Sequence, residues 1–211
     1  MKIISYRDRE EKLRQIGEVC RKYLRGRVLD LGCDVKTLKK FVVGEYMGVD
    51  IMGTPDVKVN LEEGLPFSSD SFDTVIAIDV LEHLENLHNL FDEICRVSRR
   101  YALIGLPNVY EWHFRMLFLM GRNISGKYGL PPEKKEDRHR WIFTLEESRR
   151  FLRERGGRKG WEVIEEIYGF YRYRTFFPVL VNQVGKFLCH IGLGRNLYPY
   201  HYLAVMRKKK L

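Results

Sequence analysis

The stretch VLDLGCD (residues 28–34) decides how this chain folds. Its apolar start leads into Asp30 and Gly32, and a second apolar stretch, YMGVD (residues 46–50), ends in Asp50. Parallel strands of an α/β sheet present acids and glycines in this way at their carboxyl ends, where a nucleoside cofactor binds. The two stretches therefore predict the first two strands of such a sheet.

Strands and helices alternate outward from this stretch. FDTVIAID (residues 72–79) is nearly continuous apolar sequence and suits a central parallel strand that is covered on both faces. The strands that we expect are 27–31, 45–50, 56–60, 72–79, 101–106, 161–168 and 200–206. The helices that we expect lie at 7–24, 35–42, 87–97 and 112–120, and one begins at the capping-box pattern of Thr144 and Glu147. The alternation predicts an α/β fold with a seven-stranded, mostly parallel sheet and helices on both faces.

Length and composition are those of one ordinary domain. The chain has 211 residues, of which 45% are hydrophobic and 31% charged. We divide this single domain into a cofactor-binding half (26–108) and a substrate-covering half (109–200) with an inserted loop at 121–143. The chain begins without a signal-peptide pattern, and it has no apolar run long enough for a membrane span. Its four cysteines are widely spaced, which predicts reduced thiols in the cytoplasm and no metal site.

Charge is unevenly distributed along the chain. Residues 1–95 hold 13 Lys/Arg against 18 Asp/Glu, a net charge of −5, whereas residues 96–211 hold 24 against 10, a net charge of +14. A basic half suits an anionic small molecule, nucleic acid or a membrane surface, although solvated surface charge explains it equally well. The aromatic and basic run 168–174 fits either stacked bases or a strand edge. The apolar stretch 176–191 fits a core helix, a substrate lid or an interfacial helix.

The residues around the first two strands predict how a nucleoside would be held. Gly32 permits a sharp turn and a close approach of the backbone to a ligand. Asp30 can orient this loop or accept hydrogen bonds from a bound amine. Asp50 is placed to accept both hydroxyls of a ribose.

The adenine end of the site would lie at the third strand. Asn60 and the backbone N–H of Leu61 can contact the edge of the base, and Ile51 can pack on its face. A dinucleotide is excluded because Asp34 places a negative charge where a pyrophosphate would sit. A phosphate-free cofactor with a positive centre fits better.

At this point the sequence resembles a known family, the class I S-adenosylmethionine-dependent methyltransferases of type 11/23. The resemblance covers residues 26–108, motif by motif and in the family's order. Its motifs are VLDLGCD (28–34), GVDI (48–51), NLEEGLPF (60–67), SFD (71–73) and DVLEHL (79–84). A weaker match is formed by KYGLPP (127–132) and DRHRW (137–141). The resemblance implies the family's Rossmann-like fold, S-adenosylmethionine as cofactor, S-adenosylhomocysteine as product and an enzyme that transfers a methyl group.

The resemblance also implies roles for particular residues. Asp30 and Gly32 would shape the pocket for the methionine end, with Cys33 and Asp34 beside them. Asp50 and Ile51 would hold the ribose and the adenine, and Asn60 and Leu61 the adenine edge. Asp79 and Val80 would border the methionine amino group and the sulfonium. The candidate catalytic residues are His83, at the mouth of the pocket, and His139, in the inserted loop, each of which could serve as a general base or as a structural residue.

Three functions remain open at this level. The first is methyl transfer to an anionic or lipid-linked small molecule, with peripheral contact to a membrane. The second is RNA methylation by the basic half. The third is a non-catalytic binding protein, because Asp34 and Lys36 stand where the family usually has glycine. The acceptor and the oligomeric state do not follow from the sequence.

Overall fold

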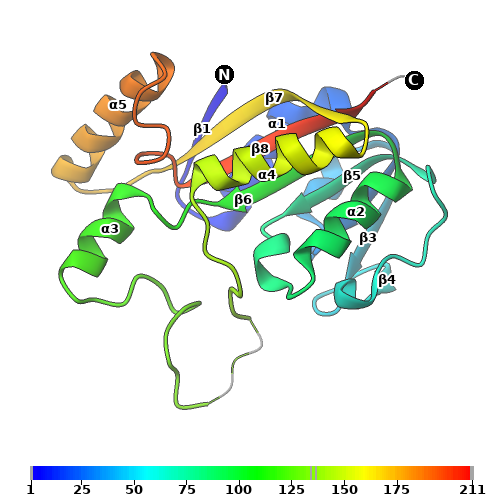
Figure 1. Cartoon of the computed structure of the whole chain (residues 1–211), viewed down its shortest axis with the longest axis horizontal. Coiled ribbons are helices and arrows are strands. Elements are labelled where there is room, and N and C mark those ends of the chain that lie inside the picture. Colours follow the sequence, from blue (N-terminus) through cyan, green and yellow to red (C-terminus); the bar gives the residue numbers. More distant parts are fainter. Residues whose placement is uncertain (1, 134, 136, 210–211) are drawn as a thin grey trace.

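The computed structural model describes residues 2–133, 135 and 137–209, which form one central sheet flanked by helices (Figure 1). The strands are β1 (Lys2–Tyr6), β2 (Arg25–Leu31), β3 (Val43–Asp50), β4 (Val57–Lys58), β5 (Phe72–Ile78), β6 (Ser98–Pro107), β7 (Trp161–Tyr171) and β8 (His201–Lys208). The α-helices are α1 (Arg9–Cys20), α2 (Leu87–Val97), α3 (Trp112–Leu119), α4 (Leu145–Arg158) and α5 (Phe176–His190). Short 3₁₀ helices are η1 (Arg21–Tyr23), η2 (Thr37–Phe41), η3 (Leu61–Glu63) and η4 (Leu81–His83).

The strands lie in the order β1-β7-β8-β6-β5-β2-β3-β4. Strand β8 is antiparallel to both of its neighbours, and every other pair is parallel. After β4 the chain returns to place β5 on the other side of β2, so the order of strands reverses between β2 and β5. In open α/β sheets, ligands bind at the carboxyl ends of the strands at such a reversal. The α/β class and the mostly parallel sheet are therefore confirmed.

The expected number of seven strands is wrong, because an eighth strand, β1, forms at the start of the chain. Its five residues pair in parallel with β7, at the edge of the sheet. Alternate side chains, Ile4 and Tyr6, are buried, whereas Ile3 is exposed. This alternation is visible in the sequence KIISY but is only five residues long, and the pairing partner lies more than 160 residues away along the chain.

Two other expected elements are shorter or of another type. The helix expected at 35–42 is the 3₁₀ turn η2, because the backbone at Lys36 is left-handed and cannot begin an α-helix there. The strand expected at 56–60 pairs only through Val57–Lys58. It stops there because the Asn60 side chain caps η3, which turns the chain away from the sheet.

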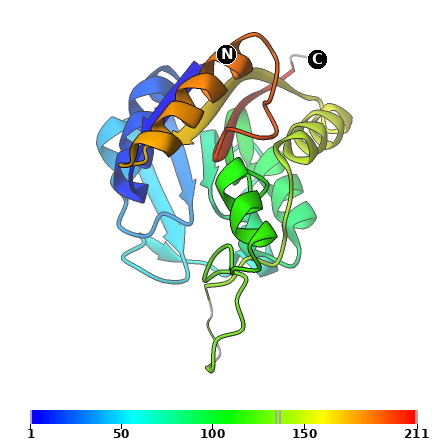
Figure 2. The ribbon, with the colours of Figure 1, turned by 90° about the vertical axis from the view of Figure 1, so that its left-hand side faces the viewer.

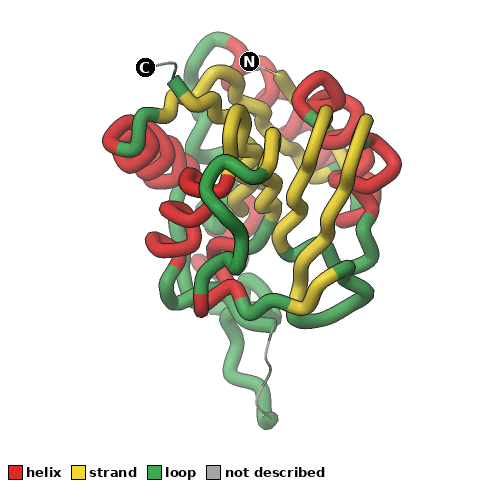
Figure 3. Tube along the Cα trace, turned by 90° about the vertical axis from the view of Figure 1, so that its right-hand side faces the viewer, coloured by secondary structure: helices red, strands yellow, loops and turns green. Residues whose placement is uncertain are grey.

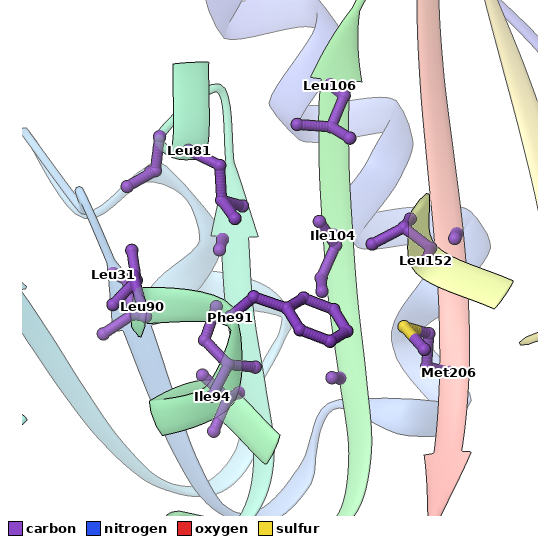
Figure 4. Packing of buried hydrophobic residues seen from close by; sticks show 14 of the residues in the cluster. Leu31, Leu81, Leu90, Phe91, Ile94, Ile104, Leu106, Leu152 and Met206 are labelled. Carbon is purple, nitrogen blue, oxygen red and sulfur yellow. The ribbon is translucent and has the colours of Figure 1, made fainter. Parts of the chain in front are cut away.

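The sheet divides the hydrophobic core into two layers. Leu31, Ile104 and Met206 point to the face that α2 and α4 cover, where Phe91 and Leu152 pack on them (Figure 4). Residues an odd number of positions away on the same strands point to the other face, which α1 covers; examples are Val28, Leu103 and Val205 packed with Leu13 and Ile16. Helices thus lie on both sides of the sheet (Figure 3).

Two helices leave the carboxyl edge of the sheet without covering either face. Helix α3 follows β6 and α5 follows β7, and both lie in front of the sheet edge in Figure 2. The segment that joins α3 to α4 extends beyond them. In the part of the chain that the structure describes, no helix combines the length and the apolar character needed to cross a membrane.

Candidate cofactor and acceptor site

The turn after β2 has a left-handed backbone at three positions. The φ angles are +67° at Gly32, +47° at Asp34 and +56° at Lys36. A Cβ atom on Gly32 would lie 2.6 Å from Cγ2 of Val80, so this position has room only for glycine. Asp34 and Lys36 adopt the conformation that glycine favours, although they are not glycine. The turn therefore keeps the backbone of a glycine loop.

The side chains of Asp34 and Lys36 are engaged in ion pairs on either side of the turn. Asp34 pairs with Arg9 of α1. Lys36 Nζ lies 2.7 Å from Oδ1 of Asp56, just before β4. These pairs draw one side chain toward α1 and the other toward β4. The side chains of Asp34 and Lys36 thus each have a partner, on α1 and just before β4.

Asp50 lies at the carboxyl end of β3, where a ribose would be bound. Its Oδ2 accepts a hydrogen bond from the N–H of Asp34 (2.9 Å), and its Oδ1 accepts one from the N–H of Met52 (3.0 Å). Each oxygen keeps a second acceptor position, so the fixed carboxylate can still accept two hydroxyls. The next side chain, Ile51, is 61% exposed and is available to the face of a base.

The Asn60 amide is used inside the protein. Its Oδ1 accepts the N–H of Glu62 (3.2 Å), and its Nδ2 donates to Oε1 of Glu63 (2.7 Å). The side chain thus caps η3, which begins at Leu61. The amide keeps a second N–H and a second acceptor position, so it can still contact an adenine edge.

Asp30 is buried at the end of β2. Its Oδ2 accepts a hydrogen bond from the Tyr46 hydroxyl at 2.6 Å. Burial raises the pKa of Asp30 to about 7, against the opposing effect of the bond from Tyr46. Cys33 is buried close to Gly48, where an added Cβ atom would lie 2.8 Å from its Sγ. Cys33 is thus a packing residue of the loop.

Asp79, at the end of β5, is held by two cationic or hydrogen-bonding partners that the sequence did not reveal. Its carboxylate pairs with Lys12 of α1, and its Oδ1 lies 2.9 Å from Nε2 of the buried His201 at the start of β8. Burial alone would raise the pKa of Asp79, but the charges of Lys12 and His201 outweigh it and hold the pKa well below its usual range. Lys12 lies beside the apolar face of its helix, and His201 is the first residue of an apolar strand. Neither residue could therefore be recognised from the sequence as a partner of Asp79.

The expected catalytic residues His83 and His139 lie together, although 56 residues separate them. Their rings meet edge to face with centroids 4.5 Å apart. Nδ1 of His83 lies 3.0 Å from the carbonyl oxygen of Arg138, and Nδ1 of His139 lies 2.7 Å from the Tyr128 hydroxyl. Burial, together with neighbouring positive groups, lowers the pKa of both histidines, that of His139 to about 4. Both are therefore neutral near pH 7 and keep a lone pair.

Glu82 completes this cluster and was quoted in the sequence motif without a role. Its Oε1 lies 3.9 Å from Nε2 of His139. Its backbone carbonyl accepts the N–H groups of Arg140 (2.8 Å) and Trp141 (3.3 Å). These bonds fasten the end of the inserted loop to η4 and bring His139 to the edge of the sheet.

A cavity of about 670 Å³ lies between α1 and the turn after β2. Four basic side chains line it: Arg9, Lys36, Lys39 and Lys40. Asp50 and Asn60 are not part of its lining. The cavity therefore borders the loop that would hold the methionine end, and it does not border the acid at the end of β3.

The aromatic run 168–174 is largely internal. Tyr168 and Phe170 are fully buried in β7, where no base could stack on them. Residues 168–171 belong to β7, which is an internal strand and not an edge, whereas Arg172 and Arg174 are exposed beyond its end; base stacking on the two buried rings is wrong.

The fold and the left-handed turn define a nucleoside-binding α/β protein, and the comparisons give its family. The family model for a methyltransferase domain matches residues 6–165. The chain therefore belongs to this methyltransferase family and is an S-adenosylmethionine-dependent enzyme. The residues fit that cofactor, since the turn at Gly32 leaves the backbone open and the Asp50 carboxylate can still accept two hydroxyls. No curated protein matches the chain in sequence.

Solved structures share the fold at low sequence identity. A SAM-dependent methyltransferase from Archaeoglobus fulgidus is 19% identical, with a TM-score of 0.58 over 94% of this chain and 97% of that one. Magnesium protoporphyrin IX methyltransferase from Synechocystis PCC 6803, with bound SAH, is 17% identical, with a TM-score of 0.58 over 95% and 83%. The methyltransferase domain of bacterial CtHen1 is 15% identical, with a TM-score of 0.61 over 95% and 98%. Such distant likenesses support the fold and leave the acceptor open.

Proposed function

We propose that this enzyme methylates an anionic, lipid-linked acceptor at the surface of a membrane. The observation that carries the proposal is the apolar surface of α3 and α5 at the carboxyl edge of the sheet. Phe118 on α3 is 74% exposed and Phe176 on α5 is 81% exposed. Further exposed apolar residues of the two helices and their ends are Met116, Leu119, Met120, Phe177, Val179, Leu180, Val184, Phe187 and Ile191.

The two helices approach one another at their first turns. The ring of Trp112, at the start of α3, lies 6.5 Å from that of Phe177 in α5, and 5.7 Å from that of Tyr173. Soluble monomers rarely expose so many large apolar side chains in one place, and such patches commonly mark an interaction site. A fatty or polyprenyl chain would cover this surface while its head group reached the sheet edge.

The basic half of the chain supplies the matching charge. Residues 96–211 carry a net charge of +14. Each basic residue near an anionic membrane surface adds about 1 kcal/mol of attraction. Within α5, Lys186 is the one Lys or Arg residue, and Arg172 and Arg174 come just before the helix. Apolar helices flanked by basic residues favour an anionic lipid surface over a free, water-soluble acceptor.

For the cofactor we propose the positions that the sequence motifs imply. Asp50 would hold the ribose, with Ile51 on the adenine and Leu61 beside its edge. The fixed carboxylate at the end of β3 supports the first role, and the exposure of Ile51 supports the second.

The methionine end would lie along the turn after β2. We propose Asp30 for its amino group, with the Gly32–Asp34 turn and Val80 as the wall. The basic cavity beside this turn supports a role for Arg9 and Lys36 near its carboxylate. Asp79 is held by Lys12 and His201, which supports an indirect role as a positioning residue rather than a direct contact.

The cofactor, when bound, supplies a methyl group on a positively charged sulfur, so that alignment and exclusion of water are the main needs of the reaction. Asp50 and the turn after β2 would hold the cofactor, which would supply its methyl group to an acceptor oxygen or nitrogen. The acceptor loses its proton to a neutral imidazole or to water. His139 and His83 are neutral near pH 7, which supports the proposal that one of them takes this proton.

The proposal is tested by supplying the enzyme with labelled S-adenosylmethionine and separate cell fractions. We expect the label in the chloroform-soluble lipid fraction. Phe176→Ser and Phe187→Ser should lower this labelling at least severalfold and should weaken sedimentation with anionic vesicles. The matched control is Val43→Ser, which removes a 51% exposed apolar residue from the opposite edge of the sheet.

Other outcomes decide against the proposal. Label in RNA or in a water-soluble compound, unaffected by Phe176→Ser, would exclude a lipid-linked acceptor. Calorimetry that showed no binding of S-adenosylhomocysteine would instead support a non-catalytic binding protein.

A further inference from the structure

A carboxylate and two imidazoles converge at the carboxyl edge of the sheet. Glu82 and His83 belong to η4, and His139 belongs to the inserted loop. One ligand-type atom of each residue lies within 4.8 Å of those of the other two. The spacing of the cysteines predicted no metal site, and His139 lies 56 positions beyond His83 in the sequence.

One side-chain oxygen of Glu82 is buried and makes no hydrogen bond to the described residues. The residue is only 1% exposed, and its Oε2 has no hydrogen-bond partner among the described residues. A buried polar atom without a partner is rare in native proteins and costs roughly 1–3 kcal/mol. A cation at this point would satisfy the oxygen.

Both histidines are oriented as metal ligands usually are. Nδ1 of His83 lies 3.0 Å from the Arg138 carbonyl, which can only accept, so this nitrogen carries the proton and Nε2 keeps the lone pair. Nδ1 of His139 faces the Tyr128 hydroxyl, and its Nε2 is the atom 3.9 Å from Glu82. Metal-binding histidines typically donate their other nitrogen to such a carbonyl or hydroxyl.

Hydrogen bonds fix the backbone around the three residues. Small side-chain movements would bring their ligand atoms close enough to share one ion. The bonds from Arg140 and Trp141 to the Glu82 carbonyl hold the loop at η4. Ligands about 2.1 Å from one ion are about 3.0–3.5 Å apart. The Glu82–His139 distance of 3.9 Å would therefore shorten by about 0.4–0.9 Å, and the other ligand atoms, now within 4.8 Å of one another, would also move closer by side-chain rotation.

From this geometry we infer that Glu82, His83 and His139 form a binding site for a divalent transition-metal ion such as Zn²⁺ or Mn²⁺. Two imidazoles and one carboxylate suit these ions better than Ca²⁺, which prefers oxygen ligands alone. Three protein ligands leave further positions on the ion open, as in metal sites that also bind a substrate or water. The site would also tie the inserted loop to the sheet.

A metal ion in this cluster would change the role proposed above for His83 and His139. An ion would occupy the lone pairs that a general base needs, so His83 or His139 would take the acceptor's proton only in the metal-free enzyme, and in the metal-bound enzyme the proton would pass to water. The two roles differ in one direct respect. A metal site binds Zn²⁺ or Mn²⁺ in the absence of cofactor and acceptor, whereas a pair of bases does not.

The test is calorimetry of the whole chain with Zn²⁺ and with Mn²⁺ after treatment with a chelator. We expect one ion per chain for at least one metal. Glu82→Gln and His139→Gln should each weaken its affinity by about tenfold or more, as loss of a ligand does. His190→Gln, in an exposed histidine at the end of α5, is the matched control and should bind as the unaltered chain does.

A second measurement separates ion binding from folding. Bound metal should protect the segment 121–133 from limited proteolysis, and His139→Gln should lose this protection while keeping its thermal unfolding temperature. Equal metal affinity in Glu82→Gln, His139→Gln and the unaltered chain would overturn the inference, as would no binding of either metal. Binding of S-adenosylhomocysteine is measured separately, so failure here leaves the proposed function standing.

Discussion

The carboxyl edge of the sheet has two sides, which differ in whether their charged side chains are paired and their apolar side chains are covered. On the cofactor side, near β2 and β3, charged residues pair within the protein: Arg9 with Asp34, and Lys36 with Asp56. On the acceptor side, Phe118 and Phe176 are exposed, and the buried Glu82 has an oxygen that finds no hydrogen-bond partner within the described part of the chain. Both sides belong to the same edge, but only the first is complete in the isolated chain.

This difference indicates where binding would change the protein. A side that is already paired and fixed loses little conformational freedom when a ligand arrives, so it is preorganised. A side with exposed apolar groups and an unsatisfied carboxylate gains interactions only when something covers it. We therefore expect the cofactor side to respond to mutation through stability and cofactor affinity, and the acceptor side through activity.

The largest effect on the completed side is expected from Lys12→Met. The change leaves the mostly buried Asp79 carboxylate with His201 as its remaining partner, and loss of one partner of a buried pair costs about 3 kcal/mol. Urea denaturation measures the loss. The double variant Lys12→Met/Asp79→Asn removes both charges and should recover most of the stability. An unchanged denaturation midpoint for Lys12→Met would show that this pair does not stabilise the fold.

The next effect concerns cofactor affinity. Asp50→Ala removes the acceptor for the ribose hydroxyls, and hydrogen bonds to a charged group contribute roughly 1.5–3 kcal/mol each. We therefore expect calorimetry to show S-adenosylhomocysteine binding weaker by about tenfold to a hundredfold. Asp70→Asn, at an exposed left-handed position far from the site, is the control and should bind normally. Equal affinities for the two variants would place the ribose elsewhere.

The pH dependence of cofactor binding should reveal Asp30. Its pKa is raised to about 7 by burial, so it is about one tenth ionised at pH 6 and about nine tenths at pH 8. Only the ionised carboxylate attracts a bound ammonium group. The affinity for S-adenosylhomocysteine should therefore rise about tenfold from pH 6 to pH 8, and Asp30→Asn should remove this rise. A flat profile in the unaltered enzyme would exclude a charged contact between Asp30 and the cofactor.

The sequence predicted the parts of this molecule that depend on local patterns. Strand β5 and helix α4 follow from a continuous apolar run and a capping box, which act over neighbouring residues. The positions of Gly32 and Asp50 follow from the ends of predicted strands. Strand β1, by contrast, depends on a partner at the far end of the chain.

The parts of the site that the sequence missed depend on contacts between distant residues. Lys12 and His201 reach Asp79 from opposite ends of the chain, and each looks ordinary among its own neighbours. Glu82 was visible in its motif, but its role depends on His139, which only the folded loop brings near. Residue type alone cannot predict such pairings, because many acids and bases in the chain are solvated.

The smallest effect is expected where the sequence departs most from the family. Asp34→Gly/Lys36→Gly would relieve two left-handed residues, at about 1 kcal/mol each, but it would also remove two partly exposed ion pairs worth about 0.5 kcal/mol each. Stability should therefore change by about 1 kcal/mol at most, and S-adenosylhomocysteine affinity by less than about threefold, since the backbone of the turn is already that of a glycine loop. Gly32→Ala is the contrasting variant, because its Cβ would strike Val80, and it should weaken binding clearly. A gain in affinity above about tenfold in the double variant would mean that Asp34 and Lys36 do obstruct the cofactor, and the cofactor side would then be less complete than its ion pairs indicate.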